Sequence, residues 1–130
     1  GAGGAPEIAA MAKEVLIILK HGKKAFVEKL DFITSAGFLD GGNARERAGM
    51  PGKGPVAVIT DLGILEPDPV TRELTLTSLH PGVTVEQVQA ETGWRLRIAN
   101  DLKQTPPPTE RELVELRALH ERTRQAHGTA

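Results

Sequence analysis

Apolar residues in this chain follow two patterns, helical spacing and short continuous runs. Near the start, Met11 and Ala12 follow Ile8 by three and four positions, and this spacing predicts a helix over residues 5–13. The run VLIIL at 15–19 follows almost directly, and such a run is typical of a strand covered on both faces in a parallel sheet. The order of loop, helix and buried strand predicts the second half of a βαβ unit, whose first strand is expected upstream of Gly1.

The segment 21–55 has no clear period. AFVEKLDFI at 25–33 is compatible with one short strand, but seven glycines occupy positions 22–54. Glycine at this density indicates special backbone angles. We expect an ordered surface loop that contacts another molecule.

Strand patterns dominate from residue 55 onward. VAVIT at 56–60 predicts a buried strand, and 62–79 predicts two strand segments joined by a turn at 67–72. RLRIA at 95–99 predicts the next strand.

Two capping boxes predict helices in the second half of the chain. Thr84 with Gln87 predicts a short helix, and Gly93 stands where a left-handed helix terminator is expected. After three consecutive prolines, Thr109 with Glu112 predicts a helix over 109–126. Its apolar stripe, formed by Leu113, Leu116 and Leu119, predicts a docked terminal helix.

Composition narrows the class of protein. The 130 residues suit a single domain, and 16 basic against 17 acidic residues give a formal charge of -1, which provides no global field for nucleic acid or an anionic membrane. There is no cysteine, and the four histidines show no metal-ligand spacing, so no metal site is expected. Without a long apolar run or a signal peptide, a cytoplasmic protein is expected.

The glycine loop GAGGA at 1–5 is the sharpest local motif. It lacks the GK[ST] of a nucleotide P-loop and the third glycine of a dinucleotide fingerprint. Its backbone N–H groups, at the start of a helix, can face an oxyanion or a thioester carbonyl. A tight turn without a ligand explains the loop equally well.

Two basic segments are further candidates, HGKK at 21–24 and NARERAGMPGKG at 43–54. Their side chains could contact phosphates or carboxylates, or a partner surface, but a solvated loop is an equal alternative. The candidates are His21, Lys23, Lys24, Arg45 and Arg47. Asp61 and His80 fit turn or capping positions better than catalytic ones.

Four motifs in one order resemble a known family. GAGGAPEIAAMAK, HGKKAFVEKLDFITSAGFLDGGNARERAGMPG, VITDLGILEPD and SLHPGVTVEQVQAETGW are similar to the C-terminal part of the β subunit of family I coenzyme A transferases, of the glutaconate and 3-oxoadipate type. The resemblance covers Gly1 to about Leu119. It implies an α/β fold with a three-layer αβα sheet that is incomplete at its N-terminal side, and a single partial domain over 1–130.

The resemblance also implies a reaction and a partner. In this family a β-subunit glutamate attacks an acyl-CoA thioester and forms a glutamyl-CoA thioester through a mixed anhydride, and a carboxylic acid, here expected to be dicarboxylic, then takes the CoA. Coenzyme A is a substrate, no separate cofactor is implied, and the partner is an α subunit in a hetero-oligomer.

The family pattern places Gly3, Gly4 and Ala5 at the oxyanion and CoA site. It places the nucleophilic glutamate upstream of Gly1, so no residue of this chain inherits that role, and we expect the chain to be inactive alone. Pro6 and Ala36 depart from the family pattern, which has a polar residue and a proline there.

Two alternatives stay open. Related β subunits that lack the glutamate hydrolyse a carbon–carbon bond in a cyclic CoA thioester, although RERAGMPG at 45–52 is closer to the transferase branch. The chain could also be a non-catalytic module that docks an anion or a partner.

Overall fold

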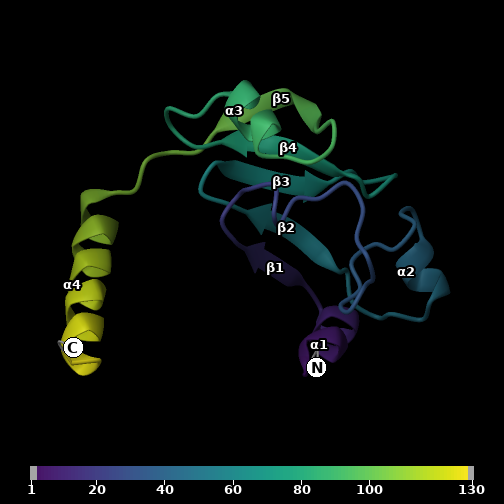
Figure 1. Cartoon of the computed structure of the whole chain (residues 1–130), viewed down its shortest axis with the longest axis horizontal. Coiled ribbons are helices and arrows are strands. Elements are labelled where there is room, and N and C mark those ends of the chain that lie inside the picture. Colours follow the sequence, from purple (N-terminus) through teal and green to yellow (C-terminus); the bar gives the residue numbers. More distant parts are fainter. Residues whose placement is uncertain (1–2, 129–130) are drawn as a thin grey trace.

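A five-stranded sheet carries the fold of residues 3–128, the part of the chain that the computed structural model describes (Figure 1). The strands lie side by side in chain order: β1 Val15–Ile18, β2 Pro55–Ile59, β3 Gly63–Pro67, β4 Leu74–Leu79 and β5 Arg97–Gln104. The helices are α1 Ala5–Met11, α2 Ala44–Arg47, α3 Val85–Ala90 and α4 Glu110–Ala126. This arrangement confirms the predicted α/β class.

The sheet is mixed, whereas the run at 15–19 predicted a parallel one. β1 pairs with β2 and β4 with β5 in parallel, but β3 is antiparallel to both of its neighbours. The reason is chain length, because the short connections on either side of β3 permit only hairpins, while the longer segments before β2 and β5 permit parallel crossovers. Four strands therefore run the same way, and their carboxyl ends lie at one end of the sheet.

The core lies where α3 and the loop after β1 cover the sheet. Leu65 and Leu76 from the strands and Val88 from α3 are fully buried. Phe26 and Leu96 enter the same cluster from loops. The capping box of α3 is present as predicted, since Thr84 and Gln87 each bond the other's backbone N–H.

β1 forms as predicted but is not covered on both faces. Ile17 packs against the core, whereas Leu16 is 62% and Ile18 77% exposed. Side chains alternate between the two faces of a strand, and the described residues place no element over the second face of β1.

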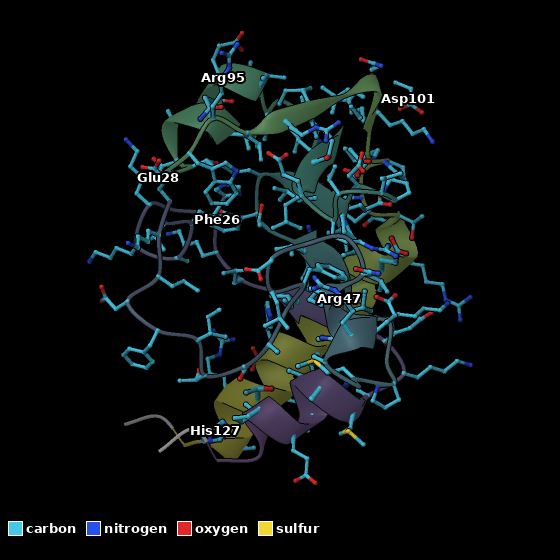
Figure 2. The ribbon with its side chains drawn as sticks, turned by 90° about the vertical axis from the view of Figure 1, so that its right-hand side faces the viewer. Phe26, Glu28, Arg47, Arg95, Asp101 and His127 are labelled. Carbon is cyan, nitrogen blue, oxygen red and sulfur yellow. The ribbon has the colours of Figure 1, made fainter. Side chains whose placement is uncertain are left out.

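The strand predicted at 25–33 is absent. Phe26 turns into the core, while Phe32 in the same stretch is 76% exposed (Figure 2 labels Phe26). A helical turn after His21 starts the segment, because Ala25 and Phe26 both donate their N–H to the carbonyl of Gly22. The rest of 21–54 is an ordered loop with one short helix, α2.

Gly93 is not the predicted left-handed terminator. Its φ lies outside the left-handed region, and α3 ends earlier, with Glu91 as its C-cap. The N–H of Gly93 donates to the carbonyl of Phe26 at 2.8 Å, and a Cβ at Gly93 would lie 2.5 Å from that oxygen. Glycine is required here by the close approach of two backbones.

The terminal helix forms with its predicted capping box between Thr109 and Glu112. No residue of α4 is buried, and Figure 1 shows the helix standing away from the sheet. Val114, Leu116 and Leu119 are each about half exposed. Docking of α4 is thus not seen on this chain's own sheet and stays a prediction for another surface. Among residues 3–128, no helix combines the length and apolar composition needed to cross a membrane.

Candidate functional site

The glycine turn before α1 leaves the start of the helix accessible. Gly3 adopts a left-handed φ of 60°, and Gly4 is the N-cap, with no side chain capping the helix. Gly3, Gly4 and Ala5 are exposed, and a Cβ at either glycine would meet no atom within 4 Å. The first two residues of the motif, Gly1 and Ala2, lie outside the described residues. The turn can therefore admit a carbonyl oxygen or an anion close to its backbone.

Arg45 is buried and holds α1 against the long loop, which corrects its prediction as an anion contact. The residue is only 3% exposed. All its side-chain hydrogen bonds go to backbone carbonyls: Ala9 at 3.1 Å, Ala10 at 3.3 Å, Gly37 at 2.9 Å, and Ala36 and Gly52 at 3.4 Å each. The two carbonyls of α1 lie in its last turn, where the helix dipole attracts a cation. Arg45 thereby fixes the orientation of α1.

Two glycines make room for this packing. A Cβ at Gly52 would lie 1.8 Å from the carbonyl oxygen of Ala12, and a Cβ at Gly54, whose φ is 77°, would lie 2.9 Å from Nε of Arg45. Lys53, between them, donates its N–H to the carbonyl of Lys13 and pairs its ammonium with Glu14 at 2.9 Å. The two glycines of MPGKG at 50–54 are therefore required by close packing against Ala12 and Arg45. Arg47, two positions after Arg45, projects from α2 into solvent and bonds Asn43 (Figure 2).

His21 is also buried, which sequence reasoning did not foresee. Its ring stacks on Phe26 with centroids 3.9 Å apart. Nε2 lies 2.9 Å from Thr92 Oγ1 and Nδ1 3.2 Å from Thr60 Oγ1. Because the Thr92 hydroxyl donates to the carbonyl of Val88, Nε2 must donate to Thr92, and Nδ1 is then the acceptor nitrogen of the neutral ring. The Thr60 hydroxyl has one proton and two acceptors within reach, Nδ1 at 3.2 Å and the carbonyl of Gly63 at 3.3 Å.

Burial lowers the pKa of His21 below its usual value, although the charges of Asp61 and Glu91 oppose the shift. Asp61 accepts the backbone N–H of His21 at 2.8 Å, and this bond lowers the pKa of the carboxyl. Lys23 and Lys24 are exposed beside a shallow hollow at the carboxyl end of β1. Of the predicted cations, the structure thus groups His21 with Lys23 and Lys24, and places Arg45 and Arg47 separately on α2.

His80 has a larger role than the predicted turn residue. Its Nε2 donates to the carbonyl of Thr60 at 2.7 Å, and its Nδ1 lies 2.7 Å from Thr105 Oγ1. Thr60 is therefore bonded by both His21 and His80. Each of the four strands that run the same way is followed by one of these residues: His21 after β1, Thr60 after β2, His80 after β4 and Thr105 after β5. In the sequence, these hydrogen-bonded residues are marked only by their positions shortly after predicted strands.

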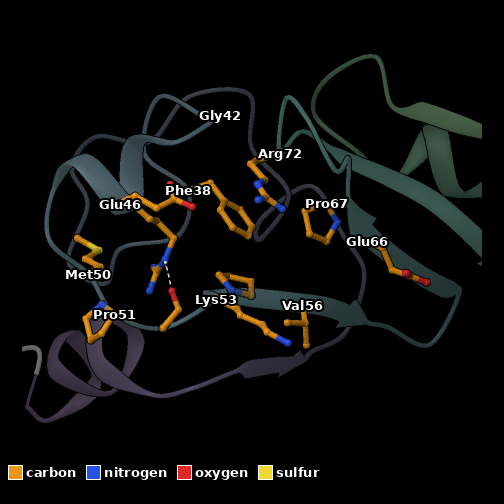
Figure 3. Close-up of a pocket in the computed structure, with 13 residues that line it drawn as sticks. Phe38, Gly42, Glu46, Met50, Pro51, Lys53, Val56, Glu66, Pro67 and Arg72 are labelled. Carbon is orange, nitrogen blue, oxygen red and sulfur yellow. Dashed lines mark hydrogen bonds between the residues drawn. The ribbon is translucent and has the colours of Figure 1, made fainter.

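A groove of about 530 Å³ lies between the long loop and the turn after β3 (Figure 3). Phe38, Met50 and Pro51 line it from the loop, and Pro67 and Arg72 from the β3–β4 connection. The guanidinium of Arg72 lies 5.7 Å from the centre of the Phe38 ring. The sequence pattern predicts only a turn at 67–72 and does not single out Arg72. In the described part of the chain, no three histidine or acidic side chains are placed to hold a metal ion.

Comparison with known proteins gives one consistent family. A family model described as Coenzyme A transferase matches residues 1–91. The chain is 61% identical over 128 residues to the β subunit of the 3-oxoadipate CoA-transferase of Pseudomonas knackmussii, covering 98% of this chain and 49% of that protein. It is 30% identical over 101 residues to the cholesterol ring-cleaving hydrolase IpdB subunit of Mycobacterium tuberculosis, covering 76% of this chain and 39% of that protein.

A solved structure agrees with these matches. The crystal structure of glutaconate coenzyme A-transferase from Acidaminococcus fermentans superposes with a TM-score of 0.80 at 36% identity, over 90% of this chain and 45% of that one. The chain thus spans about half the length of the curated relatives it matches.

Proposed function

The chain belongs to the coenzyme A transferase family, and we propose that it forms part of a β subunit that moves CoA from an acyl-CoA to a dicarboxylic acid. The observation that carries the proposal is the 61% identity, over nearly the whole chain, to the β subunit of a 3-oxoadipate CoA-transferase. The ring-cleaving hydrolase subunit is half as similar, at 30%. We therefore propose an acceptor of the 3-oxoadipate kind.

The proposed reaction has two exchanges of the same type. A glutamate carboxylate attacks the thioester carbonyl and expels CoA as a thiolate, which leaves a mixed anhydride. The thiolate then attacks the glutamyl carbonyl, which gives glutamyl-CoA and frees the donor acid. The acceptor carboxylate repeats these steps in reverse and regenerates the glutamate. We propose that this glutamate lies in a part of the protein outside the 130 residues.

The proposed task of this chain is to stabilise negative charge on the carbonyl oxygen. Each attack creates a tetrahedral oxyanion, which backbone N–H groups stabilise in the absence of bulk water. The exposed turn at Gly3, Gly4 and Ala5 supports this assignment because no side chain occupies the space in front of it. The contacts of Arg45 to Ala9 and Ala10 would keep the turn in place during the reaction.

The proposed partner is an α subunit, since the name of the 61% identical relative implies a second kind of chain. Lys23, Lys24 and Arg47 are exposed and stay candidates for contacts with that partner or with an anionic substrate.

The test is a CoA-exchange assay on the complete β subunit together with its partner. Succinyl-CoA and 3-oxoadipate should give 3-oxoadipyl-CoA and succinate, and absence of exchange with every dicarboxylate tried would refute the proposal. Gly4→Val keeps its backbone N–H but places a branched side chain in the space in front of the turn, so it should lower kcat by about 10² to 10³, as much as losing one oxyanion donor does. Met11→Val introduces the same residue at an exposed position in the last turn of α1 and should leave kcat unchanged.

A further inference from the structure

Arg72 has a backbone conformation that its residue type disfavours. Its φ is 67°, in the left-handed region, and in the part of the chain that the structure describes Leu39 is the other non-glycine residue with positive φ. Glycine or asparagine normally occupies such a position in a turn. Strain of this kind persists where the surroundings impose it, and it is found most often at functional sites.

The surroundings of Arg72 impose the conformation from two sides. Asp68 Oδ1 accepts the N–H groups of Val70 and Thr71 at 2.9 and 2.8 Å, and Arg72 donates its own N–H to the carbonyl of Asp68. Gly42 donates its N–H to the carbonyl of Thr71 at 3.1 Å. The turn is thereby fixed to the long loop, and the arginine side chain is directed over Phe38 (Figure 3).

Two acidic residues of this turn are engaged by another arginine. Asp68 and Glu73 both pair with Arg97, at 3.5 and 3.8 Å. Glu46 and Glu66 also line the groove, and Glu66 accepts the hydroxyl of Thr77. Within residues 3–128, no carboxylate lies within ion-pair distance of Arg72. The guanidinium is therefore supported by an aromatic ring and accessible to an anion from the groove.

We propose that the groove binds a phosphate-bearing small molecule, with Arg72 as the fork that holds the phosphate. Guanidinium groups bind phosphate oxygens in pairs. Lys53 lines the same groove and adds a second cation, although it also pairs with Glu14. Met50, Pro51 and Pro67 offer apolar surface to the organic part of the ligand, and the volume of about 530 Å³ suits a small molecule.

This inference goes beyond the proposed function, since the groove can bind such a ligand whether or not CoA is transferred. Two sources share the chemistry, the phosphorylated nucleotide end of a CoA ester and a free phosphate ester. Calorimetry on the complete β subunit with its partner distinguishes them, with five probes: CoA, 3′-phosphoadenosine diphosphate, ribose 5-phosphate, pantetheine and adipate.

The decisive variant is Arg72→Gly, because glycine removes the guanidinium and relieves the left-handed strain together. We expect a higher Tm and about tenfold or greater loss of affinity for the phosphorylated probes. Leu39→Gly relieves the same kind of strain without removing a cation, so it should keep wild-type affinity. Binding of CoA and the nucleotide identifies the first source, and binding of ribose phosphate as tight as that of the nucleotide identifies the second.

Either of these binding outcomes supports the phosphate site if Arg72→Gly weakens binding of the phosphorylated probes. Unchanged affinity in Arg72→Gly, or binding of pantetheine or adipate alone, would overturn the inference. Because the measurement needs no acceptor acid, it separates the two proposals. Arg72-dependent binding without any CoA exchange would support this site and contradict the proposed function. CoA exchange without Arg72-dependent binding would support the proposed function and contradict this site.

Discussion

Arg45 and Arg47 lie two positions apart in α2, yet only one of them is part of the interior. Arg45 donates to carbonyls from α1, the loop before α2 and the segment after it, whereas Arg47 bonds the side chain of Asn43 in solvent. By sequence pattern alone the two are equivalent candidate cations. Only the fold decides which one meets carbonyls that lie far from it in the chain.

Replacing these two arginines should have very different effects on stability. Arg45→Met leaves the partly buried carbonyls of Ala9, Gly37 and Gly52 without their donor, so the free energy of unfolding should fall by about 3 kcal/mol. Arg47→Met should change it by less than about 0.5 kcal/mol, because the side chain is exposed. Urea denaturation measures both, and equal losses in the two variants would contradict the buried role of Arg45.

His21 should make stability depend on pH in the mildly acidic range. Its pKa is lowered in the folded protein, so the unfolded chain binds the proton more tightly. The stabilisation is complete above the unfolded pKa of about 6.5 and is lost progressively as the pH falls toward the folded pKa. In urea denaturation between pH 7.5 and 5, His21→Gln should show a smaller decline than wild type.

The carboxyl group of Asp61 does not interfere with that experiment. Asp61 also has a lowered pKa, but a carboxylate stabilises the fold above its unfolded pKa of about 4, so its loss belongs to more acidic solutions. A decline of the same size in wild type and His21→Gln would show that the ring does not titrate as the buried geometry requires.

Among the elements, those marked by local chemistry were predictable. Capping boxes located α3 and α4, and the proline-containing turn separated β3 from β4. The stretch 25–33 was not predictable, because Phe26 is buried by residues far away in the chain, such as Trp94, at a centroid distance of 6.1 Å. Gly93 was misread for the same reason, since the constraint on it comes from the backbone of Phe26.

Helix α4 should behave as a unit separate from the sheet. None of its residues is buried, and a lone 17-residue helix is only marginally stable in water even when it is well capped. In the 130-residue chain, amide hydrogens of α4 should exchange close to the unprotected rate, while those of β3 and β4 should show protection near the global free energy of unfolding.

The predicted docking of α4 can be read from the same measurement. Addition of the rest of the β subunit or of the partner should slow exchange along Leu113, Leu116 and Leu119 if the stripe packs there. Protection of α4 equal to that of β3 in the 130-residue chain would contradict its separation from the sheet.

For the molecule as a whole, the family was predictable from the order of four motifs, and the comparisons confirm it. The candidate site was predictable only in part. The glycine turn lies open as expected, but the groove at Arg72 depends on contacts between the loop at 38–42 and the β3–β4 turn, which no local pattern reveals. The exposure of Leu16 and Ile18 likewise depends on which elements lie around β1, and the residues of β1 itself do not reveal it.

The hydrogen bonds around His21 have a consequence for the order in which the chain acquires structure during synthesis. His21 bonds Thr60, 39 residues later, and Thr92, 71 residues later. At a translation rate of about 5 to 20 residues per second, roughly 4 to 14 s pass before Thr92 follows His21 out of the ribosome. During that interval Trp94 and the backbone N–H of Gly93 cannot reach Phe26, so this aromatic side chain lacks part of its native packing until the last third of the chain has been made.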